Sequence, residues 1–157
     1  MSAKPKQLLA AGTPAPDFSL RDQSDSHASL SDYAGSPVVL LFYMADFHPV
    51  CTRQITVFNE VLPEFHRLGA QVLGISHDNI WSHVALANHL NMHFPLLSDF
   101  YPRGRVTRLY RVPIIQGESA RAAFVVDPTG KITWSCLAEP NIALDAKGAL
   151  EAVEILG

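Results

Sequence analysis

The chain has 157 residues and carries 12 Lys and Arg against 15 Asp and Glu, which gives a net charge of −3; 48% of its residues are hydrophobic. A chain of this length and composition can bury a core in one domain, which excludes a disordered chain and a small disulfide scaffold. The near-neutral charge gives no basic footprint for nucleic acid or an anionic membrane surface, and no apolar run reaches the length of a membrane-spanning helix.

The N-terminal region predicts a polar tail followed by an extended segment. Residues 1–7 are polar and are expected to be mobile. The apolar run at 8–11 is too short for the core of a secretory signal, so we expect a cytoplasmic location. Pro14 and Pro16 come just before residues 17–20, which predict a short edge strand because proline cannot donate to a sheet ladder.

The middle of the chain predicts a capped helical turn at 31–35 and then a strand, a helix and a second strand. Residues 38–43 form a continuous β-branched and aromatic run, typical of a strand that is buried on both faces. Apolar residues recur every three or four positions over 51–68, which predicts a helix with a kink at Pro63. Residues 70–76 predict a second buried strand, and such units pair in parallel in nearly all proteins.

The last part of the chain predicts further helices and a pair of antiparallel strands. Asn79 is expected to cap a helix, and a turn sequence at 127–130 is expected to join two short antiparallel strands. The expected elements are helices at 80–91, 103–110 and 146–156 and strands at 122–126 and 132–136. This element order predicts an α/β protein with a thioredoxin-like fold: a single domain over 1–157, a mixed central sheet flanked by helices, and an N-terminal extension.

Cys51 lies between a predicted buried strand and a predicted helix. The N-terminus of a helix favours negative charge and therefore favours the thiolate, which is the nucleophilic form of cysteine. The alternative is that Cys51 is a small apolar residue of the core, since free cysteine is among the most buried residue types. Cys136 is far away in the sequence and no CxxC occurs, so neither a dithiol motif nor a cysteine zinc site is expected.

Several segments carry a resemblance to a known family. Residues 42–54, Phe-Tyr-Met-Ala-Asp-Phe-His-Pro-Val-Cys-Thr-Arg-Gln, resemble the peroxidatic-cysteine loop of the peroxiredoxins, the alkyl hydroperoxide reductase and thiol-specific antioxidant family. Four further segments resemble family segments in the family's order: 13–18, 74–78, 94–99 and 121–127. The resemblance covers the chain from about Thr13 to the last helix and is closest to the one-cysteine, AhpE-like branch.

The resemblance implies a thiol peroxidase that reduces hydrogen peroxide or organic hydroperoxides through a sulfenic acid on Cys51, with Arg121 as the active-site arginine. A guanidinium can stabilise both the thiolate and the charge that builds on the leaving oxygen. The alternative for Arg121 is an exposed position at the start of a strand, although its neighbours are apolar. The peroxidase reading requires Arg121 near Cys51 and a sulfur that small oxidants can reach.

Two positions depart from the family pattern: Met44 stands where the family has proline, and His48 where it has threonine or serine. A neutral imidazole can donate and accept hydrogen bonds, so His48 is a candidate to assist catalysis. Met44 is expected beside the peroxide and is itself oxidisable. Alternatively His48 points outward and the protein is a redox sensor or interaction protein with weak activity. A hydrolase that uses Cys51 and His48 is a less favoured rival.

Gln54 lies one helical turn after Cys51 and is expected either to hold Arg121 by its carbonyl oxygen at the substrate side of the site, or to be exposed. Period-two alternation places Ile132, Trp134 and Cys136 on one core face, which favours an inert buried thiol at Cys136 over a resolving cysteine.

An external thiol is then the expected reductant of the sulfenic acid, either a thioredoxin-like protein or a low-molecular-weight thiol. No metal or organic cofactor is expected; His89 and His93 have the i,i+4 spacing of a helical metal site but lack a third ligand at a motif spacing. The resemblance also implies a homodimer.

Overall fold

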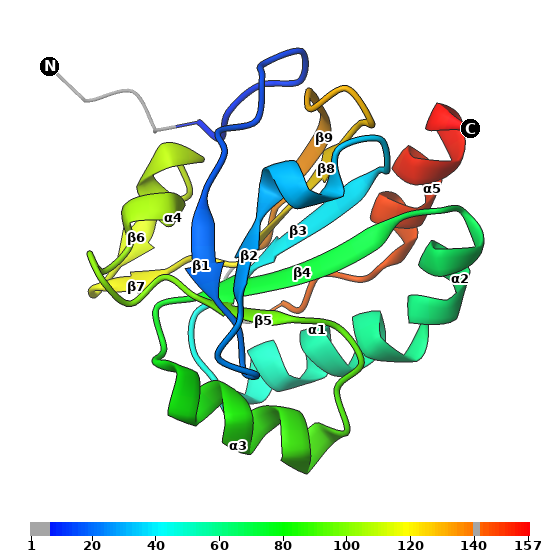
Figure 1. The fold of residues 1–157 in the computed structure, drawn as a ribbon. Coiled ribbons are helices and arrows are strands. Elements are labelled where there is room, and N and C mark those ends of the chain that lie inside the picture. The colour runs from blue at the N-terminus through cyan, green and yellow to red at the C-terminus, as the bar shows by residue number, and fades with distance from the viewer. Residues whose placement is uncertain (1–6, 140–141) are drawn as a thin grey trace, which may run out of the picture.

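The computed structural model describes residues 7–139 and 142–157 (Figure 1). The expected mobile tail at 1–7 lies outside the described residues except for Gln7, which is exposed. The strands are β1 Ser19–Arg21, β2 His27–Ser29, β3 Val38–Phe42, β4 Gln71–Ser76, β5 Leu96–Ser98, β6 Ile114–Ile115, β7 Glu118–Ser119, β8 Ala122–Val126 and β9 Ile132–Leu137. The helices are α1 Pro49–Glu60, α2 Leu62–Arg67, α3 Ile80–Leu90, α4 Arg105–Leu109 and α5 Lys147–Leu156, with a 3-10 helix, η1, at Leu30–Tyr33.

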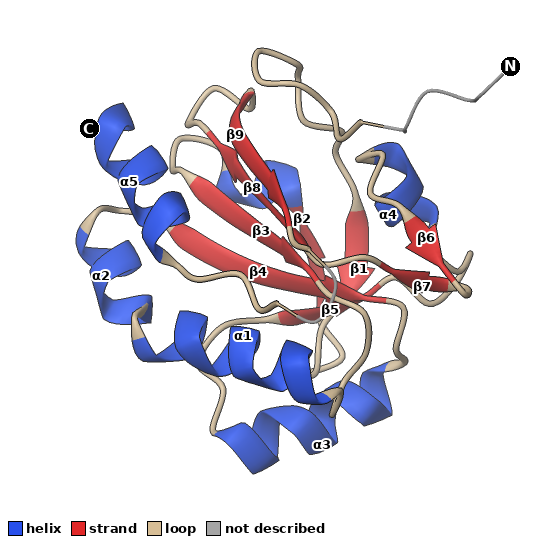
Figure 2. Cartoon of the chain, turned by 180° about the vertical axis from the view of Figure 1, so that it is seen from behind, coloured by secondary structure: helices blue, strands red, loops and turns tan. Residues whose placement is uncertain are grey.

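A mixed seven-stranded sheet forms the centre, in the order β2-β1-β5-β4-β3-β8-β9. Strands β3, β4 and β5 pair in parallel, while β8 pairs antiparallel with β3 on one side and with β9 on the other. The predicted parallel unit, the predicted antiparallel pair and the mixed sheet are therefore confirmed. Helices α1, α2 and α5 cover one face of the sheet (Figure 2), and α4 and η1 lie on the other (Figure 1).

Apolar side chains fill both faces of the sheet because β3 and β8 are buried at every position. Alternate residues of β3 point to opposite faces: Val39 and Leu41 pack beneath the α1, α2 and α5 layer, and Leu40 packs beneath η1 and α4. The continuous apolar run in the sequence reflects this two-sided burial. Among the described helices, none is long and apolar enough to cross a membrane.

Helix boundaries follow local signals closely. The predicted helix over 51–68 is present as α1 and α2, with the break at Val61 just before Pro63, where a kink was expected. Asn79 caps α3 as predicted, since its side chain accepts a hydrogen bond from the backbone N–H of Ser82 at 3.0 Å. Asn91 ends that helix in the left-handed conformation, with φ of 52°.

A bulge in β9 separates Ile132 from the face that carries Trp134 and Cys136. The register pairs Val126 with Ile132 but Val125 with Trp134, so one extra residue separates the two pairs. Ile132 therefore packs in the core on the α4 side, whereas Trp134 packs against the opposite core. The prediction that Ile132 shares a face with Trp134 and Cys136 was wrong, and Cys136 is partly exposed rather than buried.

Candidate active site

Cys51 lies in the first turn of α1, directly beyond the carboxyl end of β3. The chain between them, residues 43–48, is called the β3–α1 segment below. Phe47 turns this segment with φ of 66°, and His48 caps α1: its Nδ1 accepts a long hydrogen bond, 3.5 Å, from the backbone N–H of Cys51. Helix α1 begins at Pro49, two residues before the predicted start at residue 51. The Cys51 side chain has 0% exposure, so the expectation that small oxidants reach the sulfur directly was wrong.

Arg121 is placed at the same end of the sheet by the pairing of β8 with β3. Ala122 faces Phe42, the last residue of β3, so Arg121 lies where β3 leads into the β3–α1 segment. Its side chain is only 6% exposed, which rules out the alternative of an exposed arginine. Its Nη2 donates to the carbonyl oxygen of Glu139 at 3.0 Å, and its Nε is buried with no hydrogen-bond partner among the described residues.

Gln54 is fully buried on α1, one turn beyond Cys51. Its Oε1 accepts a hydrogen bond from the backbone N–H of Leu144 at 3.0 Å, and its Nε2 is buried without a partner within the described part of the chain. The prediction that Gln54 holds Arg121 by this oxygen was wrong, and so was the alternative of an exposed side chain. Instead, Gln54 and Arg121 separately hold the connection between β9 and α5, at Leu144 and Glu139.

Met44 and His48 lie on the β3–α1 segment as expected, and both are partly buried. Met44 packs against the core cluster that contains Cys51. His48 bonds the backbone of Cys51, and in the described residues no hydrogen bond joins its ring to the sulfur. A cysteine–histidine hydrolase needs that bond, so the structure gives the hydrolase reading no support.

A buried polar network beneath the β3–α1 segment was missed by the sequence analysis. Tyr43 donates from its hydroxyl to Asp46 Oδ1 at 2.6 Å, and His83 Nδ1 lies 2.7 Å from Asp46 Oδ2. Burial, and then the neighbouring Asp46 carboxylate, raise the pKa of Tyr43 well above its usual range, so its hydroxyl keeps the proton it donates. A signal was present, since Asp46 follows an otherwise apolar run and His83 falls on the apolar face of α3 with Ile80 and Leu86.

Cys136 lines a hollow between β9 and the segment that leads to α5, beside Leu144 and Asp145. Burial, and then the charge of Asp145, raise the pKa of this thiol above its usual range. A raised pKa leaves less thiolate at neutral pH, so Cys136 is a poor nucleophile. Both cysteines are free thiols in the structure.

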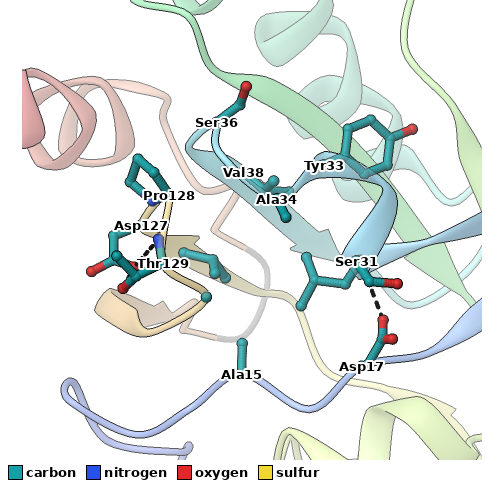
Figure 3. A pocket seen from close by; sticks show the side chains of 13 residues that line it. Ala15, Asp17, Ser31, Tyr33, Ala34, Ser36, Val38, Asp127, Pro128 and Thr129 are labelled. Carbon is teal, nitrogen blue, oxygen red and sulfur yellow. Dashed lines mark hydrogen bonds between the residues drawn. The ribbon is translucent and has the colours of Figure 1, made fainter.

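Another pocket, of about 260 Å³, opens at the other end of β3 (Figure 3). Two carboxylates line it, and both are already engaged: Asp17 accepts from the backbone N–H of Ser31, and Asp127 accepts from the hydroxyl of Thr129. It contains no thiol and no cationic side chain. The nucleophile, the buried guanidinium and the buried amide all lie away from it, so the chemistry belongs to the Cys51 end of the sheet.

The arrangement at that end can stabilise an anion. A buried guanidinium and the first turn of a helix both favour negative charge, and Arg121 forms no ion pair with any carboxylate of the described residues. The histidines considered for a metal, His89 and His93, are both exposed, and the His89 ring lies against Phe47 of the β3–α1 segment, with ring centroids 6.1 Å apart.

Comparisons with known proteins agree with this chemistry. The model of the AhpC/TSA family matches residues 11–135. Alkyl hydroperoxide reductase E of Mycobacterium tuberculosis is 34% identical over 151 residues, which cover 95% of this chain and 99% of that protein. Chloroplastic peroxiredoxin Q of Triticum aestivum is 36% identical over 128 residues, 80% of this chain, but the chain spans only 58% of that relative's length.

Solved structures give the same result. The crystal structure of peroxidoxin BcpB from Mycobacterium tuberculosis superposes with a TM-score of 0.84 and 29% sequence identity, and the match covers 94% of this chain and 97% of that one. The thioredoxin-like fold predicted from the element order is confirmed. The chain belongs to the AhpC/TSA family of peroxiredoxins.

Proposed function

We propose that this protein is a thiol peroxidase in which Cys51 reduces hydrogen peroxide or an organic hydroperoxide. The Cys51 thiolate attacks one peroxide oxygen, the O–O bond breaks, and the other oxygen leaves as hydroxide or alkoxide. Cys51 becomes a sulfenic acid. One external thiol then forms a mixed disulfide with Cys51 and releases water, and a second thiol restores the Cys51 thiol and leaves as a disulfide.

The observation that carries the proposal is the buried guanidinium of Arg121 beyond the end of β3, which forms no ion pair with a carboxylate in the part of the chain that the structure describes. A buried cation without a carboxylate partner is costly unless an anion joins it. The thiolate of Cys51 and the oxygen that leaves the peroxide are anions formed by this reaction. Arg121 and the first turn of α1 are therefore suited to bind the charge as it moves from sulfur to oxygen.

The burial of Cys51 adds a requirement to the mechanism. Peroxide reaches the sulfur only when the side chains above it move, and the start of α1 offers little resistance because its side-chain cap is a single long hydrogen bond. Opening of the β3–α1 segment is thus a step before chemistry. We expect it to limit the rate of oxidation at high peroxide concentration.

Steady-state consumption of peroxide with dithiothreitol as reductant tests the proposal. The wild-type chain should turn over, Cys51→Ser should lose all turnover, and Cys136→Ser should keep it. Arg121→Gln, which keeps a polar side chain but removes the charge and the guanidinium, should lower the rate of Cys51 oxidation about 100-fold, the usual effect of removing a hydrogen-bond donor that stabilises a transition state. Equal turnover by the wild type and Cys51→Ser would refute the proposal.

A second candidate is a peroxide sensor with slow turnover, and the complete burial of Cys51 favours it. A sensor should accumulate oxidised Cys51 because its reductants cannot enter. Slow peroxide consumption together with a Cys51 sulfenic acid that persists in the presence of dithiothreitol would favour this candidate over the peroxidase.

The reductant is proposed to be an external thiol. The raised pKa of Cys136 supports this, because a protonated thiol attacks a sulfenic acid slowly. Intact mass after oxidation should show no internal disulfide, and a Cys51–Cys136 bond would instead make Cys136 the resolving cysteine. The cytoplasmic location stays a prediction from the sequence.

A homodimer is also proposed. Three aromatic side chains beside one hollow are unusually exposed, Trp81 at 75%, Phe100 at 46% and Tyr101 at 91%. Exposed aromatic groups of this size are typical of protein interfaces. Light scattering should give the mass of two chains, and Trp81→Glu should shift it to that of one.

A further inference from the structure

We propose that His83 and Asp46 are positioning residues for the reaction at Cys51: a buried ion pair between α3 and the β3–α1 segment that fixes the segment where peroxide must enter. The inference rests on the proposed function. His83 and Asp46 contact neither Cys51 nor the substrate. They act by holding the backbone of the β3–α1 segment, which leads to Cys51 and lines the peroxide entrance.

The hydrogen-bond geometry requires a proton on Nε2 of His83 and one proton between Nδ1 and Asp46. Nε2 lies 3.0 Å from the carbonyl oxygen of Leu97, which can only accept, so Nε2 must donate. Nδ1 lies 2.7 Å from Asp46 Oδ2, and the other oxygen of that carboxylate already accepts from Tyr43. Asp46 and His83 are at least nine-tenths buried. An imidazolium facing a carboxylate satisfies every one of these groups and leaves no net charge.

The β3–α1 segment is held at two points through Asp46. Its side chain is bonded by Tyr43 and His83, and its backbone N–H donates to Asp78 Oδ2 at 2.8 Å. Asp78 is itself fixed, because the hydroxyl of Ser76 donates to the same oxygen at 2.6 Å. The central residue of the segment is thereby tied to the end of β4 and to α3.

The positions of residues on both sides of Asp46 depend on these bonds of Asp46. Met44 lies two residues before it and His48 two residues after it, and His48 caps the helix that carries Cys51. The turn at Phe47 leaves little slack between Asp46 and the cap. Releasing Asp46 should therefore shift the peroxide entrance and loosen the first turn of α1 together.

A metal ion is a poor alternative to a proton as the cation between these carboxylates and His83. Ligand atoms of Asp46, Asp78 and His83 lie within 4.8 Å of one another, as in a metal site. However, His83 Nδ1 and the Asp46 and Asp78 oxygens already take part in hydrogen bonds of 2.6 to 2.8 Å with one another or with neighbouring groups. A metal would have to displace this set of bonds, whereas a proton on His83 completes it.

His77 provides a matched control. It follows β4, is 1% exposed, and also bonds through both ring nitrogens, to the carbonyl oxygen of Gly117 at 3.1 Å and to the hydroxyl of Thr107 at 2.9 Å. Its partners hold α4 and the β6–β7 turn rather than the β3–α1 segment. Replacing it should cost stability without moving the site.

The experiment measures two rates for Cys51 in each variant: oxidation by hydrogen peroxide, and alkylation by iodoacetamide, which reports opening of the site. At low peroxide concentration, where opening does not limit the rate, oxidation should slow about 10- to 100-fold in Asp46→Ala and His83→Phe, because displacement of a site by 1 Å can cost that much. Alkylation should accelerate in both variants. His77→Phe should keep both wild-type rates while lowering Tm by a similar amount.

The conservative variant Asp46→Asn separates the effect of the hydrogen bonds, which hold the segment in position, from the effect of the carboxylate charge. In Asp46→Asn the amide can accept from Tyr43 and donate to a neutral His83, so both bonds survive and the wild-type rates should be largely restored. Nitrogen-15 spectra of the wild type should show a proton bonded to each ring nitrogen of His83 at neutral pH. A His83 ring with one bonded proton would contradict the ion pair, even if Asp46→Ala fails to fold.

Two further outcomes would overturn the positioning role of Asp46 and His83. Equal changes in the Cys51 rates for His83→Phe and His77→Phe would show a general effect of lost stability and overturn the proposal, as would an Asp46→Asn variant as slow as Asp46→Ala. If wild-type Cys51 does not react with peroxide, the proposed function fails, but the alkylation rates and the His83 spectra still test the positioning.

Discussion

His48 is the residue whose role changes most between sequence and structure. It occupies the N-cap of α1, where threonine, serine, asparagine and aspartate are the usual residues. We predict that His48→Ala lowers the free energy of unfolding by about 0.5 to 1 kcal/mol, since the capping bond is long, and that His48→Thr restores it. Urea unfolding of the three proteins measures this. Identical midpoints for His48→Ala and the wild type would mean that the cap has no energetic role.

Cys136 gives a prediction about pH. Burial and the Asp145 carboxylate raise the pKa of its thiol, so thiolate should form at a higher pH than in a free cysteine. In a Cys51→Ser background, the rate of Cys136 alkylation should therefore reach half its maximum at a higher pH than the rate for a free cysteine, whose thiol pKa is about 8.5. Asp145→Asn should lower that midpoint. A midpoint at or below that of free cysteine would contradict the assignment.

The contact between helix α5 and strand β9 predicts that alanine at position 148 destabilises the protein, although alanine is the better helix former. Gly148 is the second residue of α5, and alanine has a higher helix propensity than glycine, by up to about 1 kcal/mol in a helix interior. A Cβ at this position would lie 2.9 Å from Cζ2 of the rigid Trp134 ring, which forces the packing apart.

We expect Gly148→Ala to lower Tm. This loss of Tm should vanish in a Trp134→Phe background, because the smaller phenylalanine ring has no atom at the position of the tryptophan Cζ2. The double-mutant cycle isolates this contact. A higher Tm for Gly148→Ala in the wild-type background would contradict the packing of α5 on β9.

Long periodic elements were predictable because their patterns are local. The two-sided burial of β3 and β4 produces unbroken apolar runs, and α1 and α3 repeat their apolar residues every three or four positions. Strands β2 and β5 have three residues each, and β6 and β7 have two, which is too short for any periodicity. The bulge in β9 inverts a face in a way that alternation alone cannot reveal.

The candidate site was predictable only in part, for a similar reason. Local sequence places Cys51 at a helix start, and the β8 pairing brings Arg121 to the same end of the sheet. The burial of Cys51, the bond between Gln54 and Leu144, and the pairing of Asp46 with His83 depend on contacts between residues far apart in the chain. No spacing rule encodes such contacts.

In the molecule as a whole, the Cys51 site is closed and lies at one end of a rigid sheet. Strand β8, which directly follows Arg121, and strand β3, which leads to Cys51, are buried throughout, so the guanidinium position is fixed. The β3–α1 segment, in contrast, is irregular and is held by a few polar groups. Motion should therefore be confined to the segment. The site thus combines a fixed anion-binding group with a cover that can move.

The most direct test is the intact mass of the protein after a single equivalent of hydrogen peroxide, followed by trapping with dimedone and peptide mapping. If Cys51 is the peroxidatic residue, the wild-type protein gains one oxygen atom and dimedone labels Cys51, whereas Cys51→Ser gains neither the oxygen nor the label. An unmodified Cys51 after the peroxide has been consumed, or labelling at Cys136 instead, would contradict this role of Cys51.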